Sequence, residues 1–175
     1  VGRTGVGKST LFKLVMGLLR PAEGAITLNG IDVCAIPHAE KRKIFGYVDQ
    51  SFHLIKGTVA EQISLQDESI TRPEIEEALK YVGMMEYVES LENGLDTEIN
   101  SDSLFSQGQK QLLAIARAIV TNPPILLLDE ITANLDSMTE ERIVSVLQKA
   151  SSAHTILAIS HRLSSMIASD FVVIL

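Results

Sequence analysis

Four residues near the start of the chain have the types and the spacing of a phosphate-binding loop. Gly2, Gly7, Lys8 and Ser9 fit the pattern GxxxxGK followed by Ser or Thr. The glycines let successive backbone N–H groups point into one concavity, and the helix expected near Lys8 adds its positive dipole end. Lys8 can then reach the β and γ phosphates of a nucleoside triphosphate, and the Ser9 hydroxyl can bind the bridging Mg²⁺. The complete pattern disfavours the alternative, a glycine-rich turn without function.

Polar side chains also follow three predicted strands, and their types suit phosphate chemistry. Gln50 follows one strand, Asp129 and Glu130 follow a second, and His161 follows a third. Ligands of open α/β sheets bind at the carboxyl ends of the strands, so we expect these residues to meet at one edge. There Asp129 suits Mg²⁺, and Glu130 can orient the attacking water or accept its proton. A solvated turn and an ordinary histidine are the alternatives, and the phosphate-binding loop favours the functional interpretation.

The elements that must carry these residues indicate an α/β fold with a mostly parallel sheet. A helix that packs on the sheet and ends at 21–24 is predicted from apolar residues at helical spacing, Leu11, Leu14, Val15 and Leu18. Asn29 and Gly30 suit the turn of a short antiparallel hairpin. Apolar runs predict the longer strands at 44–48, 125–128, 155–160 and 171–175.

A largely helical region is predicted between residues 58 and about 120. Thr71 and Glu74 have the spacing of a capping box at the start of a helix that ends at Gly83. Further helices are predicted at 84–91 and 109–120, separated by a polar loop at 94–106. After the strand at 125–128, Ser137 and Glu140 are expected to cap another helix, and a short helix is expected after Arg162.

Composition argues against several other classes of protein. The chain has 175 residues, 46% of them hydrophobic, which suffices for one domain with a substantial core. The net charge of -7 argues against nucleic acid as the main partner, because nucleic-acid surfaces carry a basic excess. Cys34 is the only cysteine, so neither an intramolecular disulfide nor a cysteine zinc site can form. No apolar run reaches the ~20 residues that a membrane-spanning helix needs.

Residues 105–109, Phe-Ser-Gln-Gly-Gln, resemble the signature sequence of the ABC ATPases. Four further segments resemble motifs of the same family and stand in the family's order. They are the Q-loop glutamine at Gln50, the Walker B strand at 125–130, the D-loop at 134–136 and the switch histidine segment at 160–163. The resemblance covers the whole chain, and these elements together are far more specific than any one of them.

The resemblance implies a P-loop NTPase fold of the RecA-like type, with an inserted helical subdomain and a short antiparallel β hairpin. We therefore expect a single ABC ATPase domain over 1–175, with the nucleotide-binding α/β core at 1–57 and 121–175 and the helical subdomain at 58–120. ATP and Mg²⁺ are the implied cofactors. In the family, a central strand and an aromatic residue that stacks on adenine precede the loop, so we expect both upstream of Val1.

The resemblance also implies a role for individual residues. The catalytic residues are expected to be Glu130, His161, Lys8 and Gln50, and the Mg²⁺ ligands Ser9, Gln50 and Asp129. The nucleotide contacts are expected to be Gly2, Arg3, Thr4, Gly5, Val6, Gly7, Lys8, Ser9, Thr10, Gln50, Ser106, Gly108, Gln109 and His161. The contacts from 106–109 are expected to grip the γ-phosphate held by a second ABC ATPase domain, so that a head-to-tail pair holds two composite sites.

Residues 57–63 and the context of His161 resemble the exporter branch of the family. The implied function is that of the ATP-binding and ATP-hydrolysing motor domain of an ABC exporter, in which domain pairing and hydrolysis drive a transmembrane domain. That domain belongs to the same chain or an associated one, and the ATPase domain is expected at the cytoplasmic face of the cell membrane. We expect no nucleic acid partner.

Two alternatives stay open at this point. A soluble ABC ATPase without a transport role is typically marked by basic patches or long coiled-coil insertions, and neither is visible in this acidic chain. The signature segment departs from the usual one at Gln107 and Phe105, where the family has glycine and leucine. A binding-only regulatory site is favoured slightly by Gln107. Glu130 and His161 oppose that alternative, because both suit hydrolysis.

Overall fold

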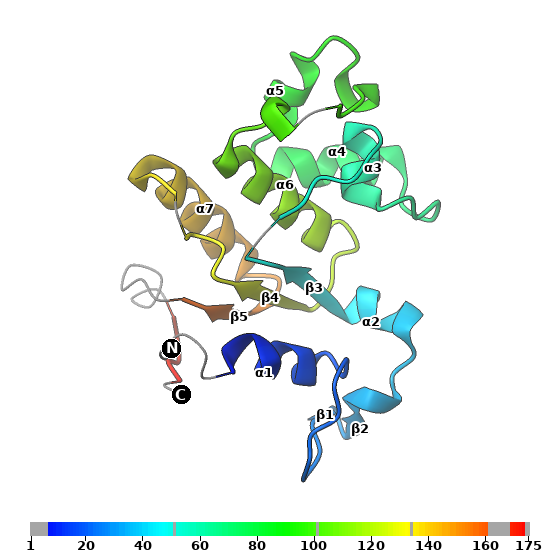
Figure 1. The fold of residues 1–175 in the computed structure, drawn as a ribbon, viewed down its shortest axis with the longest axis vertical. Coiled ribbons are helices and arrows are strands. Elements are labelled where there is room, and N and C mark those ends of the chain that lie inside the picture. Colours follow the sequence, from blue (N-terminus) through cyan, green and yellow to red (C-terminus); the bar gives the residue numbers. More distant parts are fainter. Residues whose placement is uncertain (1–6, 51, 101, 134, 161–168, 174–175) are drawn as a thin grey trace.

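A computed structural model describes residues 7–50, 52–100, 102–133, 135–160 and 169–173 and shows an α/β fold (Figure 1). The strands are β1 (Thr27–Leu28), β2 (Ile31–Asp32), β3 (Phe45–Val48), β4 (Ile125–Asp129) and β5 (Thr155–Ile159). The α-helices are α1 (Lys8–Val15), α2 (His38–Ile44), α3 (Val59–Ser64), α4 (Arg72–Tyr81), α5 (Met85–Glu89), α6 (Gln107–Ile119) and α7 (Ser137–Ala150). Three short 3₁₀ helices are η1 (Val33–Ala35), η2 (Gly94–Asp96) and η3 (Asp102–Leu104). None of the described helices is long and apolar enough to span a bilayer.

The main sheet is parallel and has the order β3-β4-β5. Its register pairs Val48 with Leu128 and Asp129 with Ile159. The central strand β4 is buried over 126–129, as expected for a strand covered on both faces. The predicted α/β fold with a parallel sheet is therefore confirmed, and the carboxyl ends of the three strands share one edge.

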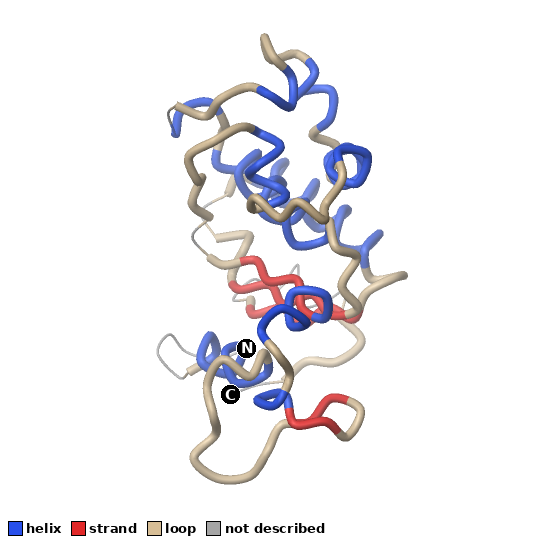
Figure 2. Tube along the Cα trace, turned by 90° about the vertical axis from the view of Figure 1, so that its right-hand side faces the viewer, coloured by secondary structure: helices blue, strands red, loops and turns tan. Residues whose placement is uncertain are grey.

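Alternating side chains of the sheet enter two separate cores. One face packs against α1 in a small core formed by Phe12, Met16, Phe45, Leu127 and Ile159. The opposite face contributes to a larger core shared with the helices above it, and its sheet residues include Val48, Leu126 and Leu128. The sheet thus forms the middle layer of the molecule (Figures 1 and 2).

The helix after the loop packs through a different face than the sequence predicted. Phe12 and Met16 are buried, whereas Leu11 and Leu18 are 40% and 50% exposed. Residues four apart lie on one side of a helix, so the buried stripe continues from Lys8 through Phe12 to Met16. The prediction that Leu11 and Leu18 face the sheet was therefore wrong by about one position along the helix.

The same helix ends earlier than the predicted stop at 21–24, because of Gly17. The N–H of Gly17 donates to the Leu14 carbonyl, and the N–H of Leu18 donates to the Lys13 carbonyl. This pair of bonds ends a helix when the residue after the cap has a left-handed conformation, and Gly17 has a φ of 63°. A side chain at this position would also collide with the Val33 carbonyl, so both the backbone conformation and the lack of space require glycine.

The predicted hairpin is confirmed, and a helix that the sequence analysis missed follows it. β1 and β2 pair antiparallel around Asn29 and Gly30, whose φ angles are 51° and 81°, as a two-residue turn requires. Helix α2 then occupies a segment for which the sequence analysis predicted no element. Pro37 precedes it, Glu40 lies in its first turn and three basic residues lie in its last turn. That charge distribution suits the helix dipole and could have revealed the helix.

Helices α3, α4, α5 and α6 lie together on the side of the sheet opposite α1 (Figure 1). The predicted start of α4 is confirmed, because the Glu74 carboxylate accepts a hydrogen bond from the Thr71 N–H at 2.7 Å. The predicted helices at 84–91 and 109–120 correspond to α5 and α6. In α6 the residues 111–116 are all buried, so this helix forms the centre of the helical layer.

Two predictions about the last third of the chain need correction. The N-cap of α7 is Asp136 and not Ser137, because the Asp136 carboxylate accepts from the Thr139 N–H at 3.0 Å. The strand predicted at 171–175 is absent over 171–173, where the side chains are exposed. A strand needs a neighbour that pairs with its backbone groups, and apolar composition alone does not supply one. Residues 174–175 and the helix predicted after Arg162 lie outside the described residues.

Candidate functional site

The described part of the phosphate-binding loop begins where the chain turns into α1. Gly7 is the N-cap of α1 and has a φ of 99°, a conformation that favours glycine. Its carbonyl accepts a hydrogen bond from the Leu11 N–H at 2.9 Å, which closes the first helical turn. The predicted helix start near Lys8 is therefore confirmed. The other predicted loop contacts, Gly2, Arg3, Thr4, Gly5 and Val6, lie outside the described residues and stay predictions.

The amino end of α1 combines a helix dipole with a lysine. This end points to the same side of the molecule as the carboxyl ends of β3 and β4 (Figure 1). Lys8 is only 6% exposed, whereas Ser9 and Thr10 are exposed. Backbone N–H groups and an ammonium at one helix start favour an anion there.

The sheet brings Gln50 and Glu130 together, as the sequence predicted. The side-chain Nε2 of Gln50 donates to Oε2 of Glu130 at 3.2 Å. Both residues are partly open to solvent, which leaves the carboxylate accessible to water. A carboxylate held in this way can orient a water molecule or accept its proton.

The backbone of Glu130 has an uncommon conformation for a residue with a side chain. Its φ is 49°, in the left-handed region. The strand β4 has just ended, and the Glu130 N–H donates to the Ile159 carbonyl at the end of β5 at 3.0 Å. Such conformations occur often at functional sites, because the surrounding structure has to hold them in place. Here the hydrogen bond to β5 fixes the point at which the chain leaves the sheet.

Asp129 is the buried carboxylate of this edge, and Tyr47 is a partner that the sequence analysis missed. Asp129 is 4% exposed. Tyr47 lies near the carboxylates of Asp129 and Asp49, and its ring packs edge-on against Phe12 of α1. Burial, followed by these two negative charges, raises the pKa of Tyr47 to about 12. Tyr47 therefore keeps its proton at neutral pH.

The predicted residues Ser106, Gly108 and Gln109 lie at the amino end of α6, in the helical layer. Ser106 is the exposed N-cap, its Oγ accepts from the Gln109 N–H at 3.2 Å and its N–H donates to the Gln109 Oε1 at 2.8 Å. This reciprocal pair is a capping box. It presents the positive end of a helix dipole at the surface, separate from the amino end of α1.

Gly108 is fixed by packing between α6 and α7. A Cβ at this position would lie 2.3 Å from the Thr139 Cγ2, which is too close for two carbon atoms that are not bonded to each other. The absence of a side chain thus lets the two helices approach each other. The sequence motif indicated a phosphate contact at Gly108, and the structure adds a packing requirement that no local pattern could have revealed.

Other predicted elements of the site are only partly described. His161 and Asn134 lie outside the described residues, so the predicted roles of the switch histidine and the D-loop stay predictions. Among the described residues, no three His, Cys, Asp or Glu side chains gather as a metal cluster. The oxygen groups available near the carboxyl edge come instead from single residues such as Gln50 and Asp129.

A parallel α/β sheet with a glycine-capped, lysine-bearing helix start and a Gln–Glu pair at its carboxyl edge defines the chain as a phosphate-binding α/β protein. The family model described as ABC transporter matches residues 1–133, and the chain therefore belongs to the ABC transporter family.

Several curated relatives align over the whole chain. A putative export ATP-binding/permease protein of Rickettsia conorii is 35% identical over 100% of this chain and 31% of its own length. The ATM1-type heavy metal exporter of Novosphingobium aromaticivorans is 37% identical, with 29% of its length covered. The ATP-dependent lipid A-core flippase of Pasteurella multocida is 40% identical, with 30% covered. The chain thus spans about three tenths of the length of these relatives.

A solved structure shows the same fold. A bacterial Atm1-family ABC exporter with ATP bound superposes with a TM-score of 0.87 and 36% sequence identity. The superposition covers 99% of this chain and 31% of that exporter chain. The resemblance inferred from the motifs is therefore confirmed at the level of family and fold.

Proposed function

We propose that this chain is the ATP-binding and ATP-hydrolysing domain of an ABC exporter. The observation that carries the proposal is the hydrogen bond between Gln50 and Glu130, because it places a water-orienting carboxylate at the edge that the amino end of α1 also faces. Relatives with the exporter names and an ATP-bound exporter structure support the same function. The two alternatives, a soluble ATPase and a binding-only site, have no comparable support.

In this proposal the residues of the chain divide the work. Gly7 and the start of α1 bind phosphate through N–H groups, and Lys8 contributes a positive charge. Glu130 orients the attacking water and accepts its proton, while Gln50 holds the Glu130 carboxylate in place. His161 is assigned to the γ-phosphate by its motif alone.

The described residues fit a bound Mg²⁺, which prefers oxygen ligands and usually keeps several waters. The Ser9 hydroxyl, the Gln50 side-chain carbonyl and the Asp129 carboxylate supply such oxygens. When bound, Mg²⁺ neutralises charge on the phosphates. Tyr47 of the neighbouring strand β3 lies near the Asp129 carboxylate and keeps its proton at neutral pH.

A second copy of the domain, or a related one, is proposed to complete each ATP site. The exposed capping box at Ser106 and Gln109 offers N–H groups and a helix dipole to an anion that does not belong to its own α1. In a head-to-tail pair this helix start faces the phosphates bound at the partner's loop, and two-fold symmetry makes two sites. ATP binding then closes the pair and hydrolysis opens it.

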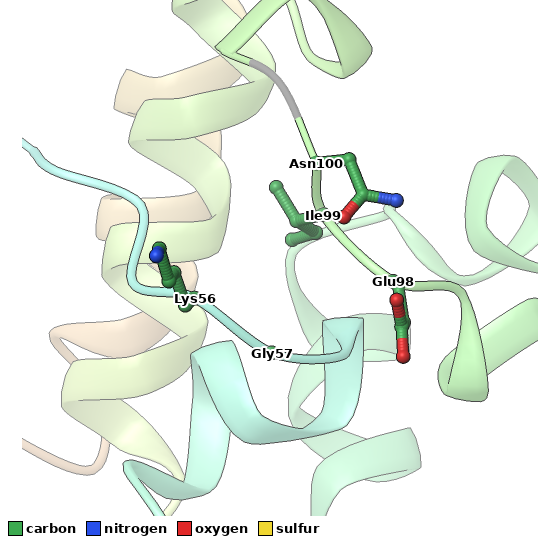
Figure 3. A pocket seen from close by; sticks show the side chains of 5 residues that line it. All are labelled: Lys56, Gly57, Glu98, Ile99 and Asn100. Atoms are coloured by element: carbon green, nitrogen blue, oxygen red, sulfur yellow. The ribbon is translucent and has the colours of Figure 1, made fainter.

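The partner that converts this motion into transport is proposed to be a transmembrane domain on the same chain or an associated one. A hollow of about 350 Å³ lies between residues 56–57 and residues 98–100 (Figure 3). The Ile99 N–H donates to the Gly57 carbonyl at 2.9 Å, which holds the segments together. Lys56, Glu98 and Asn100 supply polar groups beside Ile99, and this hollow is the proposed contact with the membrane domain. In this proposal the domain lies at the cytoplasmic face of the cell membrane.

Phosphate release from ATP by the full-length protein tests the proposal, with Lys8→Ala as the matched variant. We expect Mg²⁺-dependent hydrolysis by the wild-type protein and weakened ATP binding by the variant, because a point charge on the phosphates is lost. Equal ATP affinity in a direct titration of both proteins would contradict the role of Lys8. A wild-type protein that binds ATP and releases no phosphate would instead establish the binding-only alternative.

A further inference from the structure

One deeply buried polar side chain of the described structure uses its hydrogen-bonding capacity only in part. Gln111 lies in α6 and is 1% exposed. Among the described residues, the Gln111 Oε1 is a buried side-chain oxygen with no hydrogen-bond partner. Its Nε2 donates to the main-chain carbonyl of Gln50 at 3.5 Å, which is long for an N–H···O bond.

A second buried glutamine uses both atoms of its side-chain amide in hydrogen bonds. Gln62 in α3 accepts from the Ile55 N–H through Oε1 at 2.8 Å and donates to the Ile55 carbonyl through Nε2 at 2.8 Å. The Arg117 guanidinium also donates to the Gln62 Oε1 at 3.4 Å. Gln62 therefore fixes the segment before α3, and its hydrogen bonds offset the desolvation penalty of the buried amide group.

The side-chain amide of Gln111 does not stabilise the fold in this way. An unpaired buried oxygen destabilises the folded state, whereas an apolar side chain of the same shape is neutral or stabilising at such a position. Residues 112–116 of the same helix are all apolar and buried, so the surroundings already suit an apolar residue. The fold therefore does not explain a glutamine at position 111.

What Gln111 contacts is the residue that holds Glu130. The Gln50 carbonyl receives the Gln111 amide, and the Gln50 side chain donates to Glu130 at 3.2 Å. Ser106 is the N-cap of α6, so one rigid element connects the exposed capping box to the carboxyl edge of the sheet. Mutation of a side chain that holds a metal ligand or a catalytic group in position typically lowers activity by roughly ten- to a hundredfold.

We propose that Gln111 is a positioning residue for Gln50, and through Gln50 for Glu130. Its amide holds the main chain at Gln50 so that the Gln50 side chain stays directed at Glu130. The inference rests on the proposed function, since it gives Gln50 and Glu130 their roles in hydrolysis. Gln111 itself is not assigned a contact with the nucleotide.

The test compares Gln111→Met with Gln62→Met in the full-length protein, because methionine has nearly the shape of glutamine and lacks its amide. Thermal unfolding without nucleotide is measured first. We expect Gln111→Met to unfold at the wild-type temperature or above it, and Gln62→Met to lose roughly 5 °C, because the hydrogen bonds of the Gln62 side chain to Ile55 and Arg117 are lost. A loss for Gln111→Met as large as that for Gln62→Met would overturn the proposal in favour of a structural role.

Steady-state kinetics and a metal titration supply the other readouts. For Gln111→Met we expect kcat to fall roughly tenfold or more while KM for ATP stays within about twofold. Mn²⁺ in place of Mg²⁺, followed by electron paramagnetic resonance with a non-hydrolysable ATP analogue, should bind more weakly to the variant, because Gln50 is a proposed metal ligand. The Mn²⁺ measurement does not depend on turnover.

The outcomes separate this inference from the proposed function. Wild-type hydrolysis together with unchanged kcat and Mn²⁺ affinity in Gln111→Met overturns the inference and leaves the proposed function intact. A wild-type protein that does not hydrolyse ATP overturns the proposed function and this inference with it. A selective fall in kcat and in Mn²⁺ affinity at unchanged thermal stability supports both.

Discussion

The side-chain amide of Gln50 lies 3.2 Å from the carboxylate of Glu130, although the two residues are 80 positions apart in the chain. The sheet register explains the contact. Val48 pairs with Leu128 in the parallel ladder, and Gln50 and Glu130 each stand two positions beyond that pair. Neighbouring strands lie about 5 Å apart, which is within reach of the two side chains. The pair is therefore a direct consequence of how β3 and β4 align.

Replacing Gln50 with Ala is expected to lower the rate of ATP hydrolysis roughly ten- to a hundredfold while the protein still binds ATP. The Glu130 carboxylate loses the group that holds it and so orients water less well. The measurement is phosphate release at saturating ATP, with the exposed His53→Ala as a control from the same segment. Wild-type turnover in Gln50→Ala would show that the hydrogen bond has no catalytic consequence.

Replacing Gly108 with Ala is expected to destabilise the protein by about 1–3 kcal/mol, because the added Cβ overlaps a neighbouring side chain. That neighbour is the Cγ2 of Thr139, 2.3 Å from the Cβ position. Thr139→Ser removes this methyl group and keeps the hydroxyl that donates to Asp136. The double variant should therefore recover most of the lost stability in chemical denaturation. If Gly108→Ala lost as much stability in the Thr139→Ser background as in the wild-type protein, the α6–α7 contact would not be the cause.

The cap of α7 is expected to contribute to the pH dependence of stability. Hydrogen bonds from the Thr139 hydroxyl, and next from the Thr139 N–H, lower the pKa of Asp136. A pKa that is lower in the folded state stabilises the fold above the unfolded-state pKa of about 3.9, and this stabilisation is lost as the pH falls through the folded value. Asparagine caps a helix equally well and does not titrate.

The variant Asp136→Asn should therefore show a smaller fall in unfolding free energy than the wild-type protein between about pH 5 and about pH 2. Urea denaturation at a series of pH values measures this difference. Other carboxylates, such as Glu74 at the start of α4, titrate in both proteins and cancel in the comparison. Parallel curves for the two proteins would exclude a contribution from the cap.

Replacing Ser106 with Arg is expected to block ATP-driven pairing of two domains, because the exposed capping box is proposed to meet the partner's phosphate. Arginine also removes the cap, at a cost of about 0.5–2 kcal/mol, so a control is needed. Ser106→Gly keeps a good N-cap without bulk and should pair normally. Sedimentation with ATP and Mg²⁺, on a background that does not hydrolyse ATP, measures the dimer fraction. An undiminished dimer in Ser106→Arg would refute the composite site.

Much of the fold followed from local sequence. The hairpin around Asn29 and Gly30 depends on positive φ angles that few residues adopt, and the start of α4 depends on a bond between residues three positions apart. The end of α1 did not follow, because Gly17 is also required by the Val33 carbonyl, a contact made across the fold. Residues 171–173 are apolar and still form no strand, since pairing depends on a neighbour that the local sequence does not specify.

The candidate site shows the same division. Motif spacing placed Gln50 and Glu130 at strand ends, and the sheet register then brought them into contact. Tyr47 and Gln111 were missed, because no motif in the neighbouring sequence distinguishes a functional tyrosine in a strand, or a functional glutamine in a buried helix, from an ordinary one. Their significance comes from what lies beside them in space, the Asp129 carboxylate and the Gln50 carbonyl. The division into a core at 1–57 and 121–175 and a helical subdomain at 58–120 stays a prediction.

The central claim, that Glu130 activates water at an ATP site, is tested most directly by Glu130→Gln in the full-length protein. Glutamine keeps the shape of the side chain and the contact with Gln50, and it cannot accept a proton. ATP affinity and steady-state phosphate release are measured on the same preparation. We expect affinity to stay within a few-fold of wild type and hydrolysis to fall by about 10²–10⁴-fold, the usual contribution of a positioned base. Turnover close to that of the wild-type protein would contradict the account.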